Sequence, residues 1–293
     1  MTRTLAAALA EARAQLSAAG LGDAATDARV LICGLFDLTP TDLVLRGDRV
    51  LSSDEVARLD AALARRMARE PVHRILGMRD FHGVRLMLSV DTLEPRPDTE
   101  ILVEAILSRL SAIVAEKGSA RLLDLGTGTG AIAIALLKEV PQLFAVGADI
   151  APGALETARR NADLNGVGDR FMAVESHWFD KIEGSFDIIV SNPPYINSDV
   201  IAELEPDVRN FDPMLALDGG SDGLDAYRAI AEGVSNFLGA DGLVGLEIGF
   251  DQKSSVSALF AAQDYTLIEA LSDYGGNDRA LVFARENRYS AGP

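Results

Sequence analysis

The stretch RLLDLGTGTGAIAIALLKEV, residues 121–140, decides the fold. Its first five residues form an apolar run typical of a buried strand, and its last ten are rich in Ala, Ile and Leu and typical of a helix. The junction DLGTGTG, residues 124–130, carries glycines that permit a tight turn and a close approach of the backbone to a ligand. The stretch predicts a strand, a glycine loop and a helix.

Strand and helix patterns alternate from this stretch to the end of the chain. Further strands are expected at residues 143–149, 171–176, 186–191, 242–249, 265–270 and 279–285, and further helices at 153–166, 225–238 and 251–263. Such alternation is typical of a mostly parallel sheet with helices on both faces. The predicted fold class is therefore α/β, a Rossmann-like and mostly parallel seven-stranded sheet.

The region before the predicted sheet has a different residue pattern. Residues 2–70 are rich in Ala and Leu at three- and four-residue spacing, so we expect them to be wholly helical. Helix starts are predicted at Thr39-Pro40-Thr41-Asp42 and at Ser52-Ser53-Asp54-Glu55, where a capping residue precedes acidic residues. These patterns predict a small all-helical N-terminal domain.

A hairpin and a linker are expected to join the two parts. ILGMRDFHGVRLMLS, residues 75–89, has turn glycines and alternation, and LEPRPDTE, residues 93–100, has two prolines that forbid regular structure. A helix from Thr99 to about Ala115 should follow. We therefore expect a helical domain at 1–72, a hairpin and linker at 73–98, and the α/β domain at 99–293.

The charge of the chain bears on its partners. The formal net charge is −17 over 293 residues, and phosphate binding needs a basic patch, so direct binding to DNA is not expected. The densest basic group is Arg65, Arg66 and Arg69, which we interpret as a solvated helix face.

Other residue counts exclude further classes. The single cysteine, Cys33, allows no internal disulfide and fits a reducing compartment. The three histidines, His73, His82 and His177, lack metal-ligand spacing. No signal-peptide pattern is present, and no apolar run reaches the ~20 residues of a membrane helix. A cytoplasmic monomer without a metal and without a membrane partner is expected.

The glycine loop indicates a nucleoside site. Its spacing is G-x-G-x-G, unlike the G-x-G-x-x-G of dinucleotide sites, and it lacks the Lys-Ser/Thr of a P-loop. The next strand ends at Asp149, where a carboxylate would hold ribose hydroxyls. Loop and carboxylate together resemble the S-adenosylmethionine site of class I methyltransferases. The alternatives are a structural turn, a solvated cap at Asp149 and an NAD enzyme.

A second motif, SNPPYI at residues 191–196, follows the apolar run FDIIVS at 186–191. This run would be the fourth strand, beside the first, and ligands of such sheets lie beyond the carboxyl ends of the strands. The motif resembles the N-P-P-Y of methyltransferases that act on planar nitrogens, namely the exocyclic amines of adenine and cytosine and the side-chain amide of glutamine.

The residue types in this motif fit that chemistry. An amide nitrogen is a poor nucleophile, and two acceptors can orient its NH₂ group: the Asn192 side-chain oxygen and the Pro193 carbonyl. The prolines make that carbonyl rigid, and Tyr195 can pack against the planar group. The alternative is an Asn-Pro turn that merely ends a strand.

Further motifs point to one family. They are EPVHRILGMRDFHG (70–83), LEPRPDTE (93–100), DLGTGTGAIAIAL (124–136), SNPPYI (191–196), LEPDVRNFDPMLALDGGSDGLDAYR (204–228), EIGFDQ (247–252) and GGNDRALV (275–282). Over essentially its full length the chain resembles the HemK/PrmC-type peptide chain release factor glutamine methyltransferases. The resemblance implies methylation of the amide nitrogen (N5) of the glutamine in the Gly-Gly-Gln motif of release factors, a step in translation termination. It also implies that the helical domain helps to hold the release factor.

The resemblance also implies roles for particular residues. It assigns the methionine part of S-adenosylmethionine to Gly126, Thr127, Gly128, Thr129 and Gly130. It assigns the ribose to Asp149 and a further cofactor contact to Trp178. It assigns the glutamine to Asn192, Pro193, Pro194 and Tyr195. Asn192, Pro193 and Tyr195 would be catalytic, with Asn192 also near the cofactor.

Two residues depart from the family pattern. His177 stands where an Asp is expected before the tryptophan, and Glu94 stands where an apolar residue is usual. Two other functions stay open. A sister enzyme that methylates a glutamine of a ribosomal protein would share the N-P-P-Y motif. A nucleic-acid adenine methyltransferase should carry a basic face or an inserted recognition region, and neither is visible in the sequence.

Overall fold

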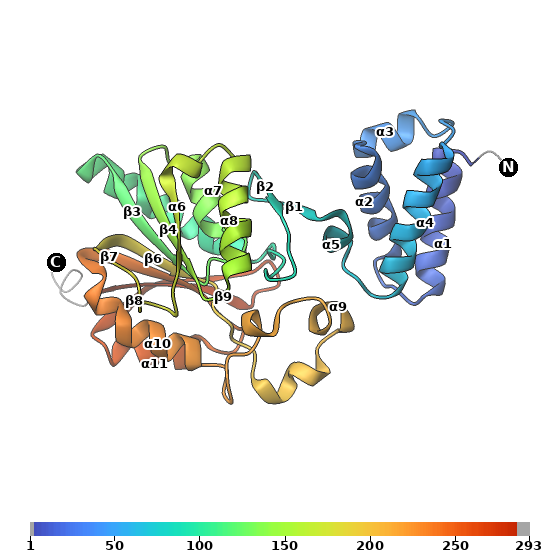
Figure 1. The fold of residues 1–293 in the computed structure, drawn as a ribbon. Coiled ribbons are helices and arrows are strands. Elements are labelled where there is room, and N and C mark those ends of the chain that lie inside the picture. Colours follow the sequence, from blue (N-terminus) through green and yellow to red (C-terminus); the bar gives the residue numbers. More distant parts are fainter. Residues whose placement is uncertain (1–2, 286–293) are drawn as a thin grey trace. The chain divides into compact units, whose positions relative to one another are not determined.

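The computed structural model describes residues 3–285, which divide into two compact units (Figure 1). Within the described residues, one unit comprises residues 3–78 and Pro206–Phe211, and the other comprises Arg79–Glu205 and residues 212–285. The short helix α9 (Pro206–Arg209) thus belongs to the unit of the N-terminal helices, although it lies far along the chain. The sequence patterns did not predict this.

The N-terminal unit is helical, as predicted. Its helices are α1 (Leu5–Ala18), α2 (Ala24–Phe36), α3 (Pro40–Leu45), α4 (Ser53–Met67) and α5 (Val72–Leu76). Thr39 and Ser52 each form a capping box, which confirms both predicted helix starts. Short non-helical connections separate the helices, and a core of Leu, Ala and Ile side chains lies between them.

Arg66 corrects the interpretation of the basic group on α4 as a solvated face. The Arg66 side chain is only 9% exposed and pairs with Asp27 and with Asp207, each at 2.7 Å. A buried guanidinium requires such partners, because an unpaired buried charge is costly. The partner Asp207 lies on α9, 141 residues away in sequence, so local patterns could not reveal it.

The predicted hairpin is confirmed. Its strands are β1 (Met78–Phe81) and β2 (Val84–Met87), joined by a turn at His82 and Gly83, both of which have positive φ. The hairpin begins later than expected because residues 72–76 form α5. The linker leads into α6 (Thr99–Lys117), which begins at the predicted residue.

The second unit contains the seven-stranded sheet. Its strands are β3 (Ala120–Leu125), β4 (Leu143–Asp149), β5 (Phe171–Glu175), β6 (Phe186–Ser191), β7 (Leu238–Glu247), β8 (Tyr265–Ser272) and β9 (Asp278–Arg285). Their order is β5-β4-β3-β6-β7-β9-β8, with only β9 antiparallel to its neighbours. The fold class is thus a class I methyltransferase fold, and β6 lies beside β3 as predicted.

Alternating side chains bury both faces of this sheet. Leu122 packs in one core with α6, α7 (Ala131–Glu139) and α8 (Pro152–Leu164). Its neighbour Leu123 points to the other face, where the core includes α10 (Asp225–Gly233) and α11 (Lys253–Ala261). Figure 1 shows these two layers of helices on either side of the strands.

Two element boundaries differ from the sequence prediction by four or five residues, and most of the others differ by one or two. The helix expected at 225–238 ends at Gly233 and continues as a 3₁₀ turn, Val234–Asn236. The strand expected from residue 242 begins at Leu238, because a bulge in its pairing with β6 accommodates the turn-like residues 239–242. Other 3₁₀ helices are Gly168–Arg170, Ser198–Glu203 and Met214–Ala216.

Candidate active site

The glycine loop leaves the carboxyl end of β3 and enters α7. Gly126, Gly128 and Gly130 have φ values of 68°, 54° and 81°, the left-handed region in which side chains other than glycine are strained. The Asn161 amide donates to the Thr129 carbonyl at 2.9 Å and fixes the far side of the loop. The loop thus presents its backbone at the start of a helix, where a ligand can approach closely.

Asp149 ends β4 beside this loop. One carboxylate oxygen accepts from the Gly128 N–H at 2.9 Å, and the other accepts from the Ala151 N–H, also at 2.9 Å. Burial raises the pKa of Asp149, while these backbone hydrogen bonds lower it. The carboxylate therefore holds the loop in place, and each of its oxygens can still accept a further hydrogen bond.

Asp124 is a site residue that the sequence analysis quoted in DLGTGTG but gave no role. Its side chain is buried, and its Oδ2 accepts from the Thr127 hydroxyl at 2.7 Å. Its Oδ1 is buried without a hydrogen-bond partner among residues 3–285. Burial first, and the charge of Asp149 to a smaller extent, raise the pKa of Asp124 to about 7. An orphaned carboxylate oxygen of this kind favours a cationic or hydrogen-bonding ligand.

The Asn-Pro-Pro-Tyr corner follows β6. The Ser191 hydroxyl donates to the Leu125 carbonyl at 2.7 Å, which ties the end of β6 to the end of β3. The Asn192 Nδ2 donates to the Thr99 hydroxyl oxygen at 3.2 Å. Its Oδ1 has no hydrogen bond to any residue that the structure describes. The corner therefore stands next to the glycine loop with one acceptor atom available.

A cavity of about 320 Å³ brings these motifs together. The predicted site residues that line it are Gly126, Thr127, Gly128, Thr129, Asp149, Trp178, Asn192 and Pro194. Asp124 and Thr99 line it too, as do the apolar residues Leu93, Ile132, Ile150 and Leu215. Gly130, Pro193 and Tyr195, which were also predicted, are not part of its wall.

Tyr195 instead packs against the core under α10 and α11. Burial raises the pKa of its hydroxyl to about 12. Its carbonyl accepts from Gln252 Nε2 at 3.0 Å, and the same nitrogen donates to the Gly223 carbonyl at 3.1 Å. A side chain at Gly223 would place Cβ 2.5 Å from the Tyr195 carbonyl oxygen. The backbone of the corner is thus held from behind by Gln252 and by a loop that approaches it closely.

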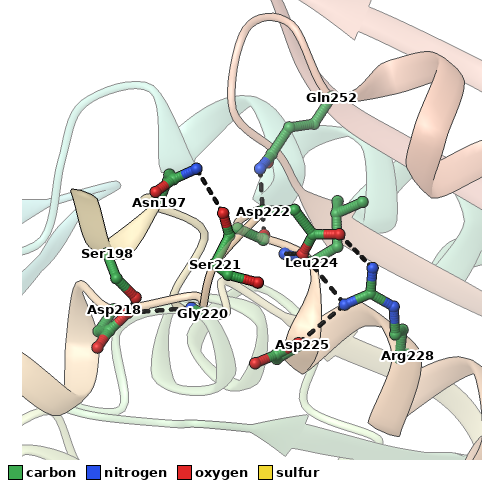
Figure 2. Close-up of polar contacts among 11 residues, drawn as sticks. Asn197, Ser198, Asp218, Gly220, Ser221, Asp222, Leu224, Asp225, Arg228 and Gln252 are labelled. Carbon is green, nitrogen blue, oxygen red and sulfur yellow. Dashed lines mark hydrogen bonds and ion pairs between the residues drawn. The ribbon is translucent and has the colours of Figure 1, made fainter. Parts of the chain in front are cut away.

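Figure 2 shows the polar contacts of that loop, residues 218–225. Asn197 Nδ2 donates to the Ser221 carbonyl at 2.6 Å, and the Ser198 hydroxyl donates to Asp218 at 2.6 Å. Arg228 pairs with Asp222 and with Asp225. These contacts tie the loop both to the residues that follow the corner and to α10.

The two departures from the family pattern have different surroundings. His177 lines the cavity with a side chain that is 63% exposed, and its ring lies edge-on to Trp178. Glu94 is buried and pairs with Arg79 of the hairpin. The linker therefore accommodates a carboxylate at this position through an ion pair.

Among residues 3–285, no group of three or more His, Cys, Asp or Glu side chains is arranged to hold a metal ion. No helix in this part of the chain combines the length and the apolar character needed to cross a membrane.

The chain is similar to two protein-family models and to solved structures. Residues 7–77 match the model of the PrmC N-terminal domain, and residues 97–204 match the methyltransferase small domain. Among solved structures, the hMettl16 catalytic domain in complex with an RNA hairpin is 14% identical, with a TM-score of 0.55. That match covers 81% of this chain and 84% of the other, and it supports the fold alone.

Curated relatives are similar over nearly the whole chain. A release factor glutamine methyltransferase of Agrobacterium fabrum is 55% identical over 96% of this chain and 98% of its own length. One from Rhodospirillum rubrum is 44% identical over 95% of this chain and 83% of its own length. Together with the cavity and its two motifs, these matches show that the chain belongs to the release factor glutamine methyltransferase family.

Proposed function

We propose that the chain is an S-adenosylmethionine-dependent methyltransferase of the side-chain amide nitrogen (N5) of glutamine. Its substrate would be the glutamine of the Gly-Gly-Gln motif in peptide chain release factors, and it would act in the cytoplasm in translation termination. One observation carries the proposal: Asn192 lines the same cavity as the glycine loop, in a chain of this family. The net charge of −17 favours a protein substrate over a nucleic acid.

The residues present fit S-adenosylmethionine. Its methionine part carries an ammonium group that can donate a hydrogen bond to the orphaned Oδ1 of Asp124, and its ribose carries two hydroxyls that can donate to Asp149. The positive-φ glycines leave the backbone of residues 126–130 open to it. We propose that this loop, Asp149 and Trp178 hold the cofactor.

The cofactor supplies an electrophilic methyl group on a positively charged sulfur. The chain must then orient a poor nucleophile. The Asn192 Oδ1 and the Pro193 carbonyl would each accept a hydrogen bond from one N–H of the glutamine amide. These two bonds would turn its nitrogen toward the methyl group. An N–C bond to the methyl group would form as the S–C bond breaks, which would leave the sulfur neutral, and the amide nitrogen would then give one proton to water.

The surroundings of the corner support this role. Gln252 holds the Tyr195 carbonyl, so the Pro193 carbonyl, two residues earlier, belongs to a backbone segment that is tied to its surroundings. Pro194, Pro213 and Leu215 line the cavity and can exclude water from the acceptors. We further propose that the helical N-terminal unit helps to hold the release factor.

The test is methyl transfer with methyl-labelled S-adenosylmethionine and three acceptors: a release factor, total ribosomal protein and duplex DNA. A release factor variant whose motif reads Gly-Gly-Glu is the matched control. Label in the native release factor alone is expected. Label in the control variant, in ribosomal protein or in DNA would assign a different substrate.

A further inference from the structure

We propose that Glu247 and Thr99 are positioning residues that set the orientation of the Asn192 amide, so that its oxygen rather than its nitrogen faces the substrate. The inference rests on the proposed function, because it concerns how the acceptor at the corner is presented. It goes beyond that function by giving roles to two residues that the sequence patterns left unassigned.

The orientation of an Asn amide matters at such a site. The two ends of the group have nearly the same shape, but one accepts hydrogen bonds and the other donates them. The NH₂ group of a glutamine can bind only to the oxygen, so an inverted Asn192 would set two donors against each other. Transfer therefore requires neighbouring groups that favour the orientation in which the Asn192 oxygen faces the substrate.

Glu247 lies beside Asn192, where it can favour this orientation of the amide. Ser191 pairs with Leu246 in the parallel ladder of β6 and β7, so Glu247 and Asn192 are the next residues on the two chains. The Glu247 side chain is buried and is not part of the cavity wall. The neighbouring Thr99 hydroxyl and Asn192 amide lower the pKa of Glu247, and its buried Oε2 has no hydrogen-bond partner among residues 3–285. Glu247 therefore acts through Asn192 rather than on the substrate.

The groups behind Asn192 favour one orientation of its amide. The Thr99 hydroxyl oxygen accepts from Asn192 Nδ2 at 3.2 Å, which leaves the hydroxyl proton to point toward the Glu247 carboxylate, whose pKa Thr99 lowers. An ionised carboxylate can only accept as well. Both partners behind Asn192 are thus acceptors, and only the orientation with Nδ2 inward and Oδ1 toward the cavity satisfies them.

The charge state of Glu247 controls this arrangement. The groups around it are Asp98 and Thr99 at the start of α6, Asn192 and Tyr195 after β6, Tyr227 on α10 and Arg279 on β9. Burial first, and the charge of Asp98 to a smaller extent, raise the pKa of Glu247 to about 7, against the lowering effects of Thr99, Arg279 and Asn192. A proton on Glu247 turns an acceptor into a donor, so the preference for the productive orientation weakens as the pH falls through about 7.

The test compares Glu247→Leu and Glu247→Gln with wild type by single-turnover methyl transfer to a release factor at saturating S-adenosylmethionine, from pH 5.5 to 8.5. The matched control is Glu269→Gln, which alters a partly exposed glutamate on β8 that pairs with Arg109. Calorimetry of cofactor binding and thermal melting are recorded for each variant, so that loss of the fold or of the cofactor site is recognised.

We expect the wild-type rate to fall below pH about 7 and Glu247→Gln to lose this dependence. Glu247→Leu should lower the rate about tenfold to hundredfold at all pH values, less than the ~10²–10³ for removal of a direct partner. Cofactor affinity should not change. The Glu269→Gln control should match wild type in rate and pH profile.

Thr99 provides a second, independent pair of variants. Thr99→Val removes the hydroxyl and should lower the rate, whereas Thr99→Ser keeps it and should restore most of the rate. An active wild type together with a Glu247→Gln variant of unchanged pH profile, or equal rates for the Val and Ser variants, would overturn the inference. An inactive wild type would instead overturn the proposed function.

Discussion

Replacement of Asn192 by Ala should abolish methyl transfer while cofactor binding survives. The Asn192 Oδ1 has no hydrogen bond to a described residue, so the atom that the substitution removes is one that the substrate would use. Removal of one well-placed partner of a reacting group typically lowers the rate by ~10²–10³. Misalignment of the glutamine nitrogen adds to that loss.

The same substitution should have a moderate cost in stability. It leaves the buried Glu247 carboxylate and the Thr99 oxygen without the donor that Asn192 provided. A buried acceptor that loses its donor costs about 1–3 kcal/mol in the free energy of unfolding. Asn192→Ala should therefore melt at a lower temperature but remain folded, and calorimetry should show nearly unchanged affinity for S-adenosylmethionine.

Two further variants at the corner are compared with Asn192→Ala. Asn192→Asp should also fail, because it places a charge beside the positively charged sulfur and loses the donor to Thr99. Tyr195→Phe is the milder comparison, because the Tyr195 hydroxyl makes no hydrogen bond to a described residue and the ring keeps its packing. The assay is methyl incorporation into release factor in a single turnover. An Asn192→Ala rate above about a tenth of wild type would refute the reasoning, since it exceeds what loss of such a partner permits.

Other predictions follow from the same geometry. Asp149→Ala should weaken S-adenosylmethionine binding by ~1.5–3 kcal/mol, because a charge-assisted hydrogen bond is lost; unchanged affinity in calorimetry would remove its role with the ribose. Gly223→Ala should lower the transfer rate more than cofactor affinity, since its Cβ would lie 2.5 Å from the Tyr195 carbonyl oxygen; equal rates would show that the corner tolerates the displacement. Asp124, whose pKa is raised to about 7, binds a proton in the folded state between pH 4 and 7 and not in the unfolded state, so its contribution to stability falls as pH rises through this range. Asp124→Asn should therefore flatten the melting temperature against pH, and an unchanged curve would contradict the shift. Low salt should not produce tight binding to duplex DNA, given the charge of −17; a salt-sensitive gel shift at micromolar protein would reopen the adenine alternative.

The motifs that the sequence revealed are those whose meaning is local. Glycines in a strand-to-helix turn need left-handed backbone, and Gly126, Gly128 and Gly130 have it. Apolar runs, β-branched in β6, predicted β4 and β6 with their observed bounds, because such residues suit buried strands. The position of Asn192 beside the glycine loop followed from the strand order of doubly wound sheets.

The residues that the sequence did not reveal depend on burial and on distant partners. Asp124 belongs to a quoted motif, but its orphaned oxygen appears only when the strands pack around it. In the sequence, Glu247 is a polar residue at the end of a predicted strand. Only the register of β7 against β6 shows that it lies beside Asn192. Arg66 reads as part of an exposed basic group, and only tertiary structure pairs it with Asp207. Tyr195 shows the opposite case, since its motif suggested packing against the substrate, whereas its partly buried ring packs against the core.

The most direct test of the central claim is the position of the transferred methyl group. Release factor that has reacted with the protein and S-adenosylmethionine is digested, and its peptides are fragmented in a mass spectrometer. We expect one added methyl group, on the side chain of the glutamine in the Gly-Gly-Gln peptide, and none when Asn192→Ala replaces the wild-type protein. A methyl group on any other residue, or an unmodified Gly-Gly-Gln peptide after reaction with the folded and cofactor-binding protein, would contradict it.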